Sequence, residues 1–562
     1  MSLVPVWDRR SLKTGSRVLM WIGLVGIIPL VLIGCSASGP EPINPTVSVL
    51  AEGGPLHGSN GMIIGPDGLI YVASVSSSVI AAINPDSGVV VEEYGPAEGV
   101  NGPDDLIFGE DGSMYWTDIA SGEVGRRTPD GVTTIVASVG PGANPITFSD
   151  DGRLFVSQCF LGTHLFEIDP DGVGEPRLIN DELGPGCGLN GMDWGPDGRL
   201  YGPRWFRGEV ARVNVDTGAV ETAASDFQIP ASVKFDSQGR LHVLDAQAGE
   251  VVRVDLESGE KEVIGRPGLG LDNFAFTPDD RLFVSSFADG SIVEVTGPET
   301  NRVVVSGGIV TPGGLAFIPG ADGIGRLFVA DSGGLLEFNA ESGEEVHAVN
   351  AMFSEVGQVM SAHADGNHLV LGSGRTVTIW DPDSDSLVAR FEGFNEAIDA
   401  LSYGGDIVVS EFGSGSVIRF SPDAPDDRTV VVSGLDEPAG LAVHNDDVYV
   451  ADRTGSVFHI LHDGNALGEP HPVVTGLAGP EGISISEDGA LFVVEEEAGR
   501  VSQIDIENGT STIVAEGLEL LGLERKALEG ITSVGYLSAV VVGDNALFVS
   551  AYPVNRVYRL DF

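Results

Sequence analysis

A unit of about 42 residues recurs along most of this chain. In its clearest copy, residues 189–204 (LNGMDWGPDGRLYGPR), apolar residues alternate on both sides of a Gly-Pro-Asp-Gly turn, which is the pattern of a β-hairpin. Each copy holds four short strand segments, and four strands per period of this length are typical of a β-propeller blade. We therefore expect an all-β protein. The copies begin at residues 60, 104, 144, 190, 231, 272, 313, 358, 399, 439, 481 and 538.

Two tandem six-bladed β-propellers are the expected architecture, because one ring usually holds about four to eight blades. The chain ends on a third strand, Arg556–Phe562, and begins its repeats at Thr46 with a fourth strand, so strands from both ends complete one blade. We expect residues 46–300 in the first propeller and 301–562 in the second, with 302–307 as the leading outer strand of the second. A division into seven and five blades is the alternative.

The composition is strongly acidic, with 82 Asp and Glu against 30 Lys and Arg and a formal net charge of −52. Such a surface repels nucleic acid, so we exclude DNA and RNA as partners. The acids are scattered through predicted turns, which favours a solvated acidic shell; attraction of cations is the alternative. We expect a monomer whose partner is a small-molecule substrate or an unidentified protein.

The N-terminus resembles a bacterial lipoprotein signal peptide over residues 1–34. Basic residues precede an apolar stretch over 18–34, and the sequence Leu-Ile-Gly-Cys ending at Cys35 matches the motif at which such proteins are cleaved and lipidated. The resemblance implies lipidation at Cys35, a tether over residues 35–45 and export to the periplasm or cell surface, and Ser36 favours the outer membrane. An uncleaved membrane anchor is the alternative, although the apolar run is short for a bilayer span.

The stretch from Asn190 to Trp194, followed by Pro-Asp-Gly, resembles the signature of the senescence marker protein, gluconolactonase and luciferin-regenerating-enzyme family. The pair Asp272-Asn273 is similar to a metal-binding pair of the paraoxonases. These resemblances imply that the first ring is a six-bladed propeller with one divalent metal on its axis and a lactone-hydrolysing activity. The second ring is more similar to NHL and streptogramin-lyase-like repeats.

The residue two before the first apolar position of each inner strand faces the axis in such rings. Five of these six positions in the first ring are Asn or Asp, and converging oxygen donors are what Ca²⁺ requires. The alternative is that these residues only cap turns. The family places a Glu where Asn60 stands and an Asp where Ala231 stands, so the site departs from the family pattern. The predicted metal ligands are Asn60, Asp104, Asn144, Asn190, Asp272 and Asn273.

Further candidates lie in loops that we expect on the same rim. Asp104, Asp272 and His57 are candidate catalytic groups, since each could activate water against a lactone carbonyl. Cys159 and Cys187 lie on adjacent rim loops, which in an exported protein favours a disulfide over two free thiols. Residues 516–530 have a helical composition and predict a short helix. The predicted ligand-binding residues of the rim are Asp118, Gln158, Arg204 and Trp205.

The sequence thus leads to two hypotheses of different classes. The first is a lipid-anchored double propeller with a metal-dependent, lactonase-like hydrolase site that uses a divalent metal, Ca²⁺, on the first axis. The second is a non-catalytic scaffold lipoprotein that binds a ligand or a protein.

Overall fold

The computed structural model describes residues 45–320, 323–520 and 537–562, which form antiparallel β-sheets without any α-helix. Ten sheets have four strands and one has six. The expected all-β class is confirmed, and the four-stranded sheets are consistent with propeller blades. Cys35 and most of the predicted helix over 516–530 lie outside the described residues. Short 3₁₀ turns follow some strands at Pro96–Glu98, Trp205–Arg207, Phe412–Ser414, Glu496–Ala498 and Tyr552–Val554.

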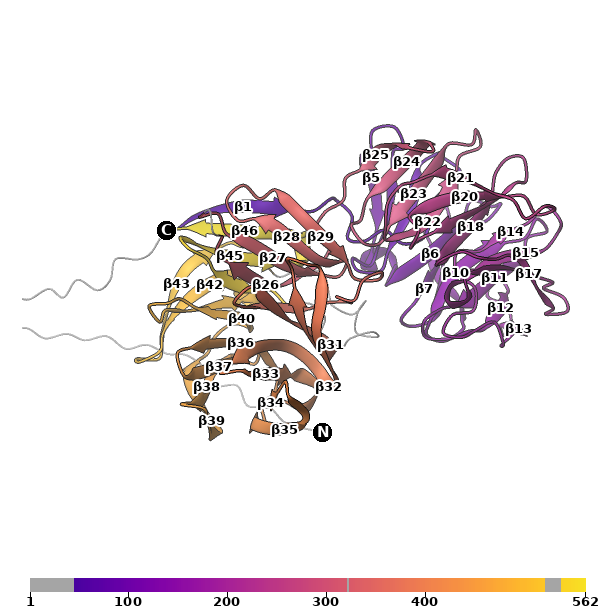
Figure 1. The fold of residues 1–562 in the computed structure, drawn as a ribbon. Helices are drawn as coiled ribbons and strands as arrows, with labels where there is room; N and C mark the ends of the chain where they lie inside the picture. Colours follow the sequence, from indigo (N-terminus) through magenta and orange to yellow (C-terminus); the bar gives the residue numbers. More distant parts are fainter. Residues whose placement is uncertain (1–44, 321–322, 521–536) are drawn as a thin grey trace, which may run out of the picture. The chain divides into compact units, whose positions relative to one another are not determined.

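Six consecutive four-stranded sheets occupy the first half of the described chain (Figure 1). In each sheet the strands pair in sequence order, as hairpins do. Their bounds are β2 (Met62–Ile64), β3 (Ile70–Ser74), β4 (Val79–Ile83), β5 (Val90–Tyr94); β6 (Pro103–Phe108), β7 (Met114–Asp118), β8 (Glu123–Arg127), β9 (Thr133–Ser138); β10 (Ala143–Phe148), β11 (Leu154–Gln158), β12 (Leu165–Ile168), β13 (Arg177–Asn180); β14 (Asp193–Trp194), β15 (Leu200–Arg204), β16 (Glu209–Val213), β17 (Val220–Ala224); β18 (Pro230–Phe235), β19 (Leu241–Asp245), β20 (Glu250–Val254), β21 (Lys261–Gly265); β22 (Leu271–Phe276), β23 (Leu282–Ser286), β24 (Ile292–Gly297), β25 (Thr300–Val305).

The second half contains one six-stranded sheet among four-stranded ones. Its strands β31 and β32 are long, and each pairs with one neighbour over its first part and with another over its last part. Two repeats therefore share one sheet. The bounds are β26 (Pro312–Ile318), β27 (Arg326–Asp331), β28 (Gly334–Asn339), β29 (Glu345–Asn350); β30 (Ser361–Asp365), β31 (His368–Asp381), β32 (Ser386–Tyr403), β33 (Asp406–Glu411), β34 (Ser416–Ser421), β35 (Ala424–Ser433); β36 (Pro438–His444), β37 (Asp447–Asp452), β38 (Ser456–His462), β39 (Asn465–Thr475); β40 (Pro480–Ile485), β41 (Leu491–Glu495), β42 (Arg500–Asp505), β43 (Thr510–Glu516); β44 (Val540–Val542), β45 (Ala546–Ala551), β46 (Arg556–Asp561).

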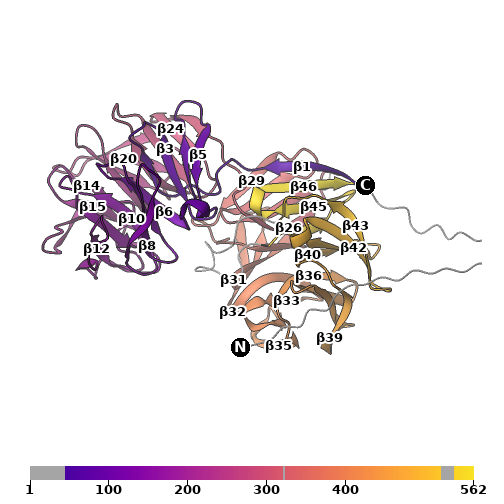
Figure 2. The same ribbon diagram turned by 180° about the vertical axis from the view of Figure 1, so that it is seen from behind.

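The first strand, β1 (Thr46–Glu52), pairs with the last, β46, in the register Thr46 to Asp561. Figures 1 and 2 both show β1 beside β46 among the C-terminal strands. Strands from both chain ends therefore share one sheet, as the repeats predict. The expected outer strand of the second half is different: β25 pairs with β24 and completes the sixth sheet of the first half. The short connection after Gly297 explains this difference, because it forms a hairpin that pairs β25 with β24.

Apolar side chains between neighbouring sheets form the core, and they also connect the first sheet of each half to the last. In the first half, Met62 and Ile70 pack with Phe283 and Ile292 of the sixth sheet, all fully buried. In the second half, Ala51 of β1 packs with side chains of β26, β27, β45 and β46. Truncation of a buried Phe typically costs about 3–5 kcal/mol, so these closing contacts contribute strongly to stability.

The hairpin turn of the repeat is held by its glycine and aspartate. The N–H of Gly198 donates to the carbonyl three residues earlier, and Gly198 has φ +72°, which glycine adopts without strain. Asp197 accepts a hydrogen bond from the Tyr201 hydroxyl on the next strand (3.1 Å). Asp67 and Tyr71 repeat this bond in the first sheet. Local chemistry therefore sets the register of these hairpins.

Arginine side chains link each of several sheets to the next. Arg281 pairs with Glu294 of its own sheet (2.7 Å) and with Asp86 of the first sheet (2.9 Å). Arg153 and Arg326 make equivalent pairs to their own and the following sheet. Because Asp86 is 78% exposed, its pair with Arg281 contributes at most about 1 kcal/mol. These ion pairs therefore contribute little to the free energy of unfolding, and their main effect is to favour contact between the two sheets that they join.

Candidate functional site

Bulges in the innermost strands place the predicted axial residues. On β6, Asp104 and Asp105 together stand opposite one residue, Thr117, because the pairing register shifts between their neighbours. Equivalent shifts occur at residues 144–145 of β10 and 272–273 of β22. A bulge interrupts the alternation of side chains along a strand and redirects them. The side chains of Asp104 and Asp105 therefore do not follow the regular alternation between the two faces of the sheet.

Four of the predicted axial residues line a single cavity of about 150 Å³: Asn60, Asp104, Asn144 and Asp272. They come from three inner strands and from the segment just before β2. None of the described residues that line this cavity carries a cationic side chain. Asn190 is buried but does not belong to the lining. The remaining walls are mostly apolar, formed by Val75, Ile119, Phe160, Trp205, Phe287 and Met352.

The two carboxylates of the cavity lack compensating partners. Within the described residues, the side chains of Asp104 and Asp272 have neither a hydrogen bond nor an ion pair. Burial, followed by repulsion from Asp272, Asp105 and Asp118, raises the pKa of Asp104 well above its usual value. Burial and repulsion from Asp105 raise the pKa of Asp272 to about 7. The two groups therefore titrate as a coupled pair that retains a proton near neutral pH.

Asp105 and Asn273 lie next to this pair in sequence but have a different environment. Asp105 accepts hydrogen bonds from the backbone N–H of Leu106 (2.9 Å) and Ile146 (3.1 Å) and from the Asn273 amide (3.3 Å). The Asn273 oxygen accepts from the Ser232 hydroxyl (2.7 Å). Both side chains are thus committed to bonds between sheets. Asn273, predicted as a metal ligand, has its amide oxygen occupied.

Hydroxyl groups on the second strands support the axial backbone. The Thr117 hydroxyl donates to the carbonyl of Asn144 (2.6 Å), and the Ser285 hydroxyl donates to the carbonyl of Asn60 (2.7 Å). Each bond links one sheet to the axial segment of the next. Thr117 and Ser285 were not predicted as functional residues, although the recurrence of Ser or Thr at this place in several repeats could have indicated them.

The predicted rim residues have different roles in the structure. Trp205 lines the cavity, whereas the Gln158 amide donates to the carbonyls of Val139 (2.9 Å) and Pro141 (3.0 Å) in a neighbouring loop. Arg204 bonds to the Leu183 carbonyl (3.0 Å) and pairs with Glu209 (2.8 Å).

Asp118 and His57 also lie outside the cavity lining. Asp118 accepts hydrogen bonds from the backbone of Ala120 and Ser121, both 3.0 Å, and so holds its turn. Burial lowers the pKa of His57 to about 4, which makes this histidine neutral at physiological pH. Neither side chain contributes to the cavity surface.

Cys159 and Cys187 form a disulfide that joins two rim loops. Phe160, the residue after the first cysteine, lies edge-on to Trp205 with ring centroids 5.6 Å apart. The disulfide thereby anchors the segment that supplies one aromatic wall of the cavity.

Carboxylates at the corresponding positions of the second half are neutralised. Asp399 lies 3.0 Å from His363, and the pair raises the pKa of that histidine despite its burial. Glu481 pairs with Arg453 (3.1 Å) and accepts from the Ser538 N–H (2.8 Å). This contrast distinguishes Asp104 and Asp272 from the other buried axial acids.

Comparisons with known proteins identify no family for the chain. It matches no protein-family model. Low-density lipoprotein receptor-related protein 1 of Pyricularia oryzae is 29% identical over 123 residues, which are 19% of this chain and 40% of that protein. The chain thus matches less than half the length of this curated relative.

Several solved structures are similar at low identity. Streptogramin B lyase is 18% identical with a TM-score of 0.37, over 51% of this chain and 95% of that one. A structure described as a gluconolactonase is 15% identical with a TM-score of 0.37, over 48% and 95%. PorZ, a surface component of the type-IX secretion system of Porphyromonas gingivalis, is 12% identical with a TM-score of 0.33, over 92% and 87%. In the described part of the chain, no helix has the length and apolarity needed to cross a membrane.

Proposed function

We propose that this chain is an exported, lipid-anchored protein of two six-bladed propellers, with a metal-dependent, lactonase-like site on the axis of the first. Six sheets packed from first to last and back to the first support the blade count in the first half. In the second half, the six-stranded sheet stands for two blades. Lipidation at Cys35 rests on the resemblance of the N-terminus to lipoprotein signals.

The observation that carries the proposed site is the pair Asp104 and Asp272. Two buried carboxylates without counter-charge destabilise a folded protein unless a proton or a cation neutralises them. Asn60 and Asn144 add neutral amide groups to the same cavity. A set of hard oxygen donors suits Ca²⁺, which takes six to eight oxygens and completes its shell with water or substrate. The residues present therefore fit a Ca²⁺ ion.

A bound divalent cation would supply Lewis-acid polarisation of a substrate carbonyl. The residues of the chain supply the rest. Asp104 and Asp272 would hold the cation, and an axial carboxylate oxygen that is not bound to the cation would accept the proton from water. Phe160, Trp205 and Phe287 form an apolar wall that excludes water and binds the hydrocarbon part of a lactone or ester.

Paired assays of hydrolysis and metal binding test the proposal. The wild type should hydrolyse at least one lactone in a panel, lose this activity with a chelator and regain it with Ca²⁺. Its apparent melting temperature should rise with Ca²⁺, since a ligand at about 100 times its Kd stabilises the native state by about 2.7 kcal/mol. Asp104→Asn combined with Asp272→Asn should abolish both responses, because neutral amides retain a divalent ion poorly.

The matched control is Asp423→Asn with Asp427→Asn, which removes the same charge from two exposed positions. This variant should behave like the wild type. An unchanged Ca²⁺ response in the Asp104 and Asp272 variant would place the metal elsewhere and contradict the proposal.

A ligand-binding scaffold is the second candidate function. The mostly apolar walls of the cavity favour it, because they suit retention of a ligand as well as its conversion. Ca²⁺ binding that depends on Asp104 and Asp272, without turnover of any lactone or ester, would identify this function.

A further inference from the structure

A second cluster of potential metal ligands lies on the sheet β36–β39, outside the axial cavity. Asp447 is the first residue of β37, and His459 and His462 are on the adjacent strand β38. Residues three apart on a regular strand point to opposite faces of the sheet. Here the pairing register shifts between Val448 and Tyr449, which inserts one extra residue into β38. This bulge brings both histidines to the same side as Asp447.

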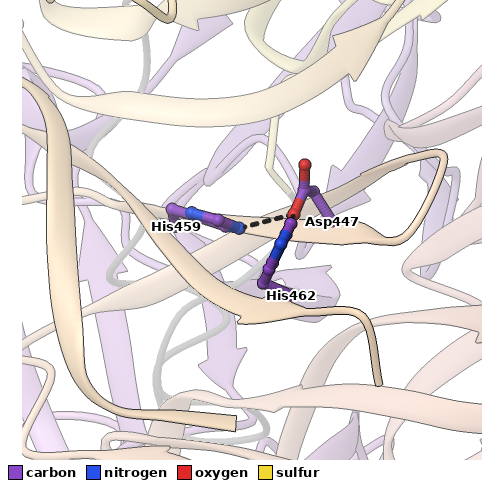
Figure 3. Close-up of side chains that lie close together, drawn as sticks. All are labelled: Asp447, His459 and His462. Atoms are coloured by element: carbon purple, nitrogen blue, oxygen red, sulfur yellow. Dashed lines mark hydrogen bonds and ion pairs between the residues drawn. The ribbon is translucent and has the colours of Figure 1, made fainter. Parts of the chain in front are cut away.

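The three side chains converge on one point. Figure 3 shows both imidazole rings turned toward the Asp447 carboxylate. Asp447 Oδ1 lies 2.9 Å from His459 Nε2 and 2.5 Å from His462 Nδ1. One ligand atom from each residue falls within 4.8 Å of the others. In a tetrahedral zinc site with bonds of about 2.0–2.1 Å, ligand atoms lie about 3.3 Å apart. To admit an ion, both Asp447 contacts would lengthen by less than about 1 Å, and His459 Nε2 would leave the Leu461 carbonyl, which lies 2.9 Å from it.

The ligand types indicate which metal the cluster would hold. Two imidazoles and one carboxylate suit Zn²⁺ and similar transition metals, whereas Ca²⁺ prefers oxygen alone. Three protein ligands leave a fourth position open to water. The site is accessible, because the His462 side chain is 56% exposed and the Asp447 side chain is 27% exposed.

Nearby acids favour a cation at this place. Asp463 lies 3.6 Å from His462 Nε2, the ring nitrogen that does not face Asp447. This distance is too long for a hydrogen bond, but the negative charge of Asp463 favours a cation at this place.

We propose that Asp447, His459 and His462 form a transition-metal site, selective for Zn²⁺ over Ca²⁺, on the sheet β36–β39. This site is independent of the proposed axial site, since it uses another sheet and nitrogen ligands.

Titration of the metal-stripped full chain with Zn²⁺, in the presence of excess Ca²⁺, tests the proposal by calorimetry. The wild type should bind one more equivalent of Zn²⁺ than His459→Gln or His462→Gln. In these variants the affinity of the Asp447 site for Zn²⁺ should be at least about tenfold lower than in the wild type, so that the site stays empty at the concentrations that fill it in the wild type; even partners outside the metal shell typically contribute about 10–100-fold. Co²⁺ should give the visible absorption of a four-coordinate ion in the wild type and lose it in both variants.

His347→Gln is the matched control, because His347 also pairs with an aspartate, Asp385 (2.8 Å), and is similarly exposed. This variant should bind Zn²⁺ as the wild type does. Asp447→Asn retains the shape of the side chain and should weaken Zn²⁺ binding without the loss of an imidazole. Equal Zn²⁺ stoichiometry in the wild type and in the combined His459→Gln and His462→Gln variant would overturn the proposal. Loss of one equivalent supports it when the variant melts at a temperature similar to that of the wild type.

Discussion

Asp104 and Asp105 show how much the surroundings of a residue decide its role. Both are buried aspartates on the same bulge of β6. Asp105 receives two backbone N–H groups and an amide, and the backbone hydrogen bonds offset part of the burial that raises its pKa. Asp104 lines the cavity without such partners, and its carboxylate is repelled by that of Asp272. One residue is part of the fold, and the other is available to a ligand.

The raised pKa values predict how stability depends on pH. In the native state Asp272 holds its proton up to about pH 7, and the pKa of Asp104 is also raised well above its usual value, whereas the unfolded state releases both protons near pH 4. Where the native state binds more protons, the free energy of unfolding falls as pH rises. In a chelator, the wild type should therefore lose stability between about pH 4 and pH 7 more steeply than Asp104→Asn with Asp272→Asn.

Urea unfolding across this pH range measures the effect. Added Ca²⁺ should stabilise the wild type more at about pH 8 than at about pH 5, because protons compete with the cation. Parallel pH profiles of the wild type and the double variant would contradict the assignment.

At the scale of elements, β1 and β25 determine how each half closes. β25 completes the last sheet of the first half, and β1 completes the last sheet of the second half by pairing with β46. The chain therefore begins with β1 in the second half, continues through all the strands of the first half, and then forms the rest of the second half. The first half is thus one continuous segment, whereas the second half combines β1 with the strands from β26 to β46.

Removal of β1 should therefore destabilise the second half first. A chain lacking residues 1–52 would expose the edge of β46, and the loss of Ala51 would expose the rest of its apolar cluster, which includes Phe548. A chain lacking residues 1–44 keeps β1 and is the control. Limited proteolysis should cut the shorter chain within residues 312–562 sooner than the control. Earlier cleavage within residues 62–305 would contradict the observed pairing.

At the scale of the whole molecule, the net charge of −52 opposes compactness. The ion pairs of Arg153, Arg281 and Arg326 are attractive, but their outer partners are more than half exposed and each contributes little. Salt weakens both the repulsion between the acidic groups and the attraction within the ion pairs. Because the repulsion is the larger of the two, we expect salt to stabilise the protein. We expect the melting temperature at neutral pH to rise between low and moderate sodium chloride, measured without divalent ions. A fall would show that the ion pairs outweigh the repulsion.

The sequence by itself determined the repeats, the hairpin turns and the all-β class, because these depend on local chemistry such as the Gly-Pro-Asp-Gly turn. It also indicated Asn60, Asp104, Asn144 and Asp272, since equal spacing in a repeat implies equivalent positions in space. These four residues line one cavity in the structure.

Only the tertiary structure decided what depends on distant partners. The alternation of residues in a strand does not show which sheet the strand will join. The outer strand at 302–307 was therefore predicted in the second half, whereas it belongs to the first. The environment of a polar side chain is equally non-local: Gln158, Arg204 and Asn273 have their hydrogen-bonding groups engaged by other segments. The bulge that unites His459 with His462 follows from the pairing of β37 with β38, which the alternation of residues does not reveal.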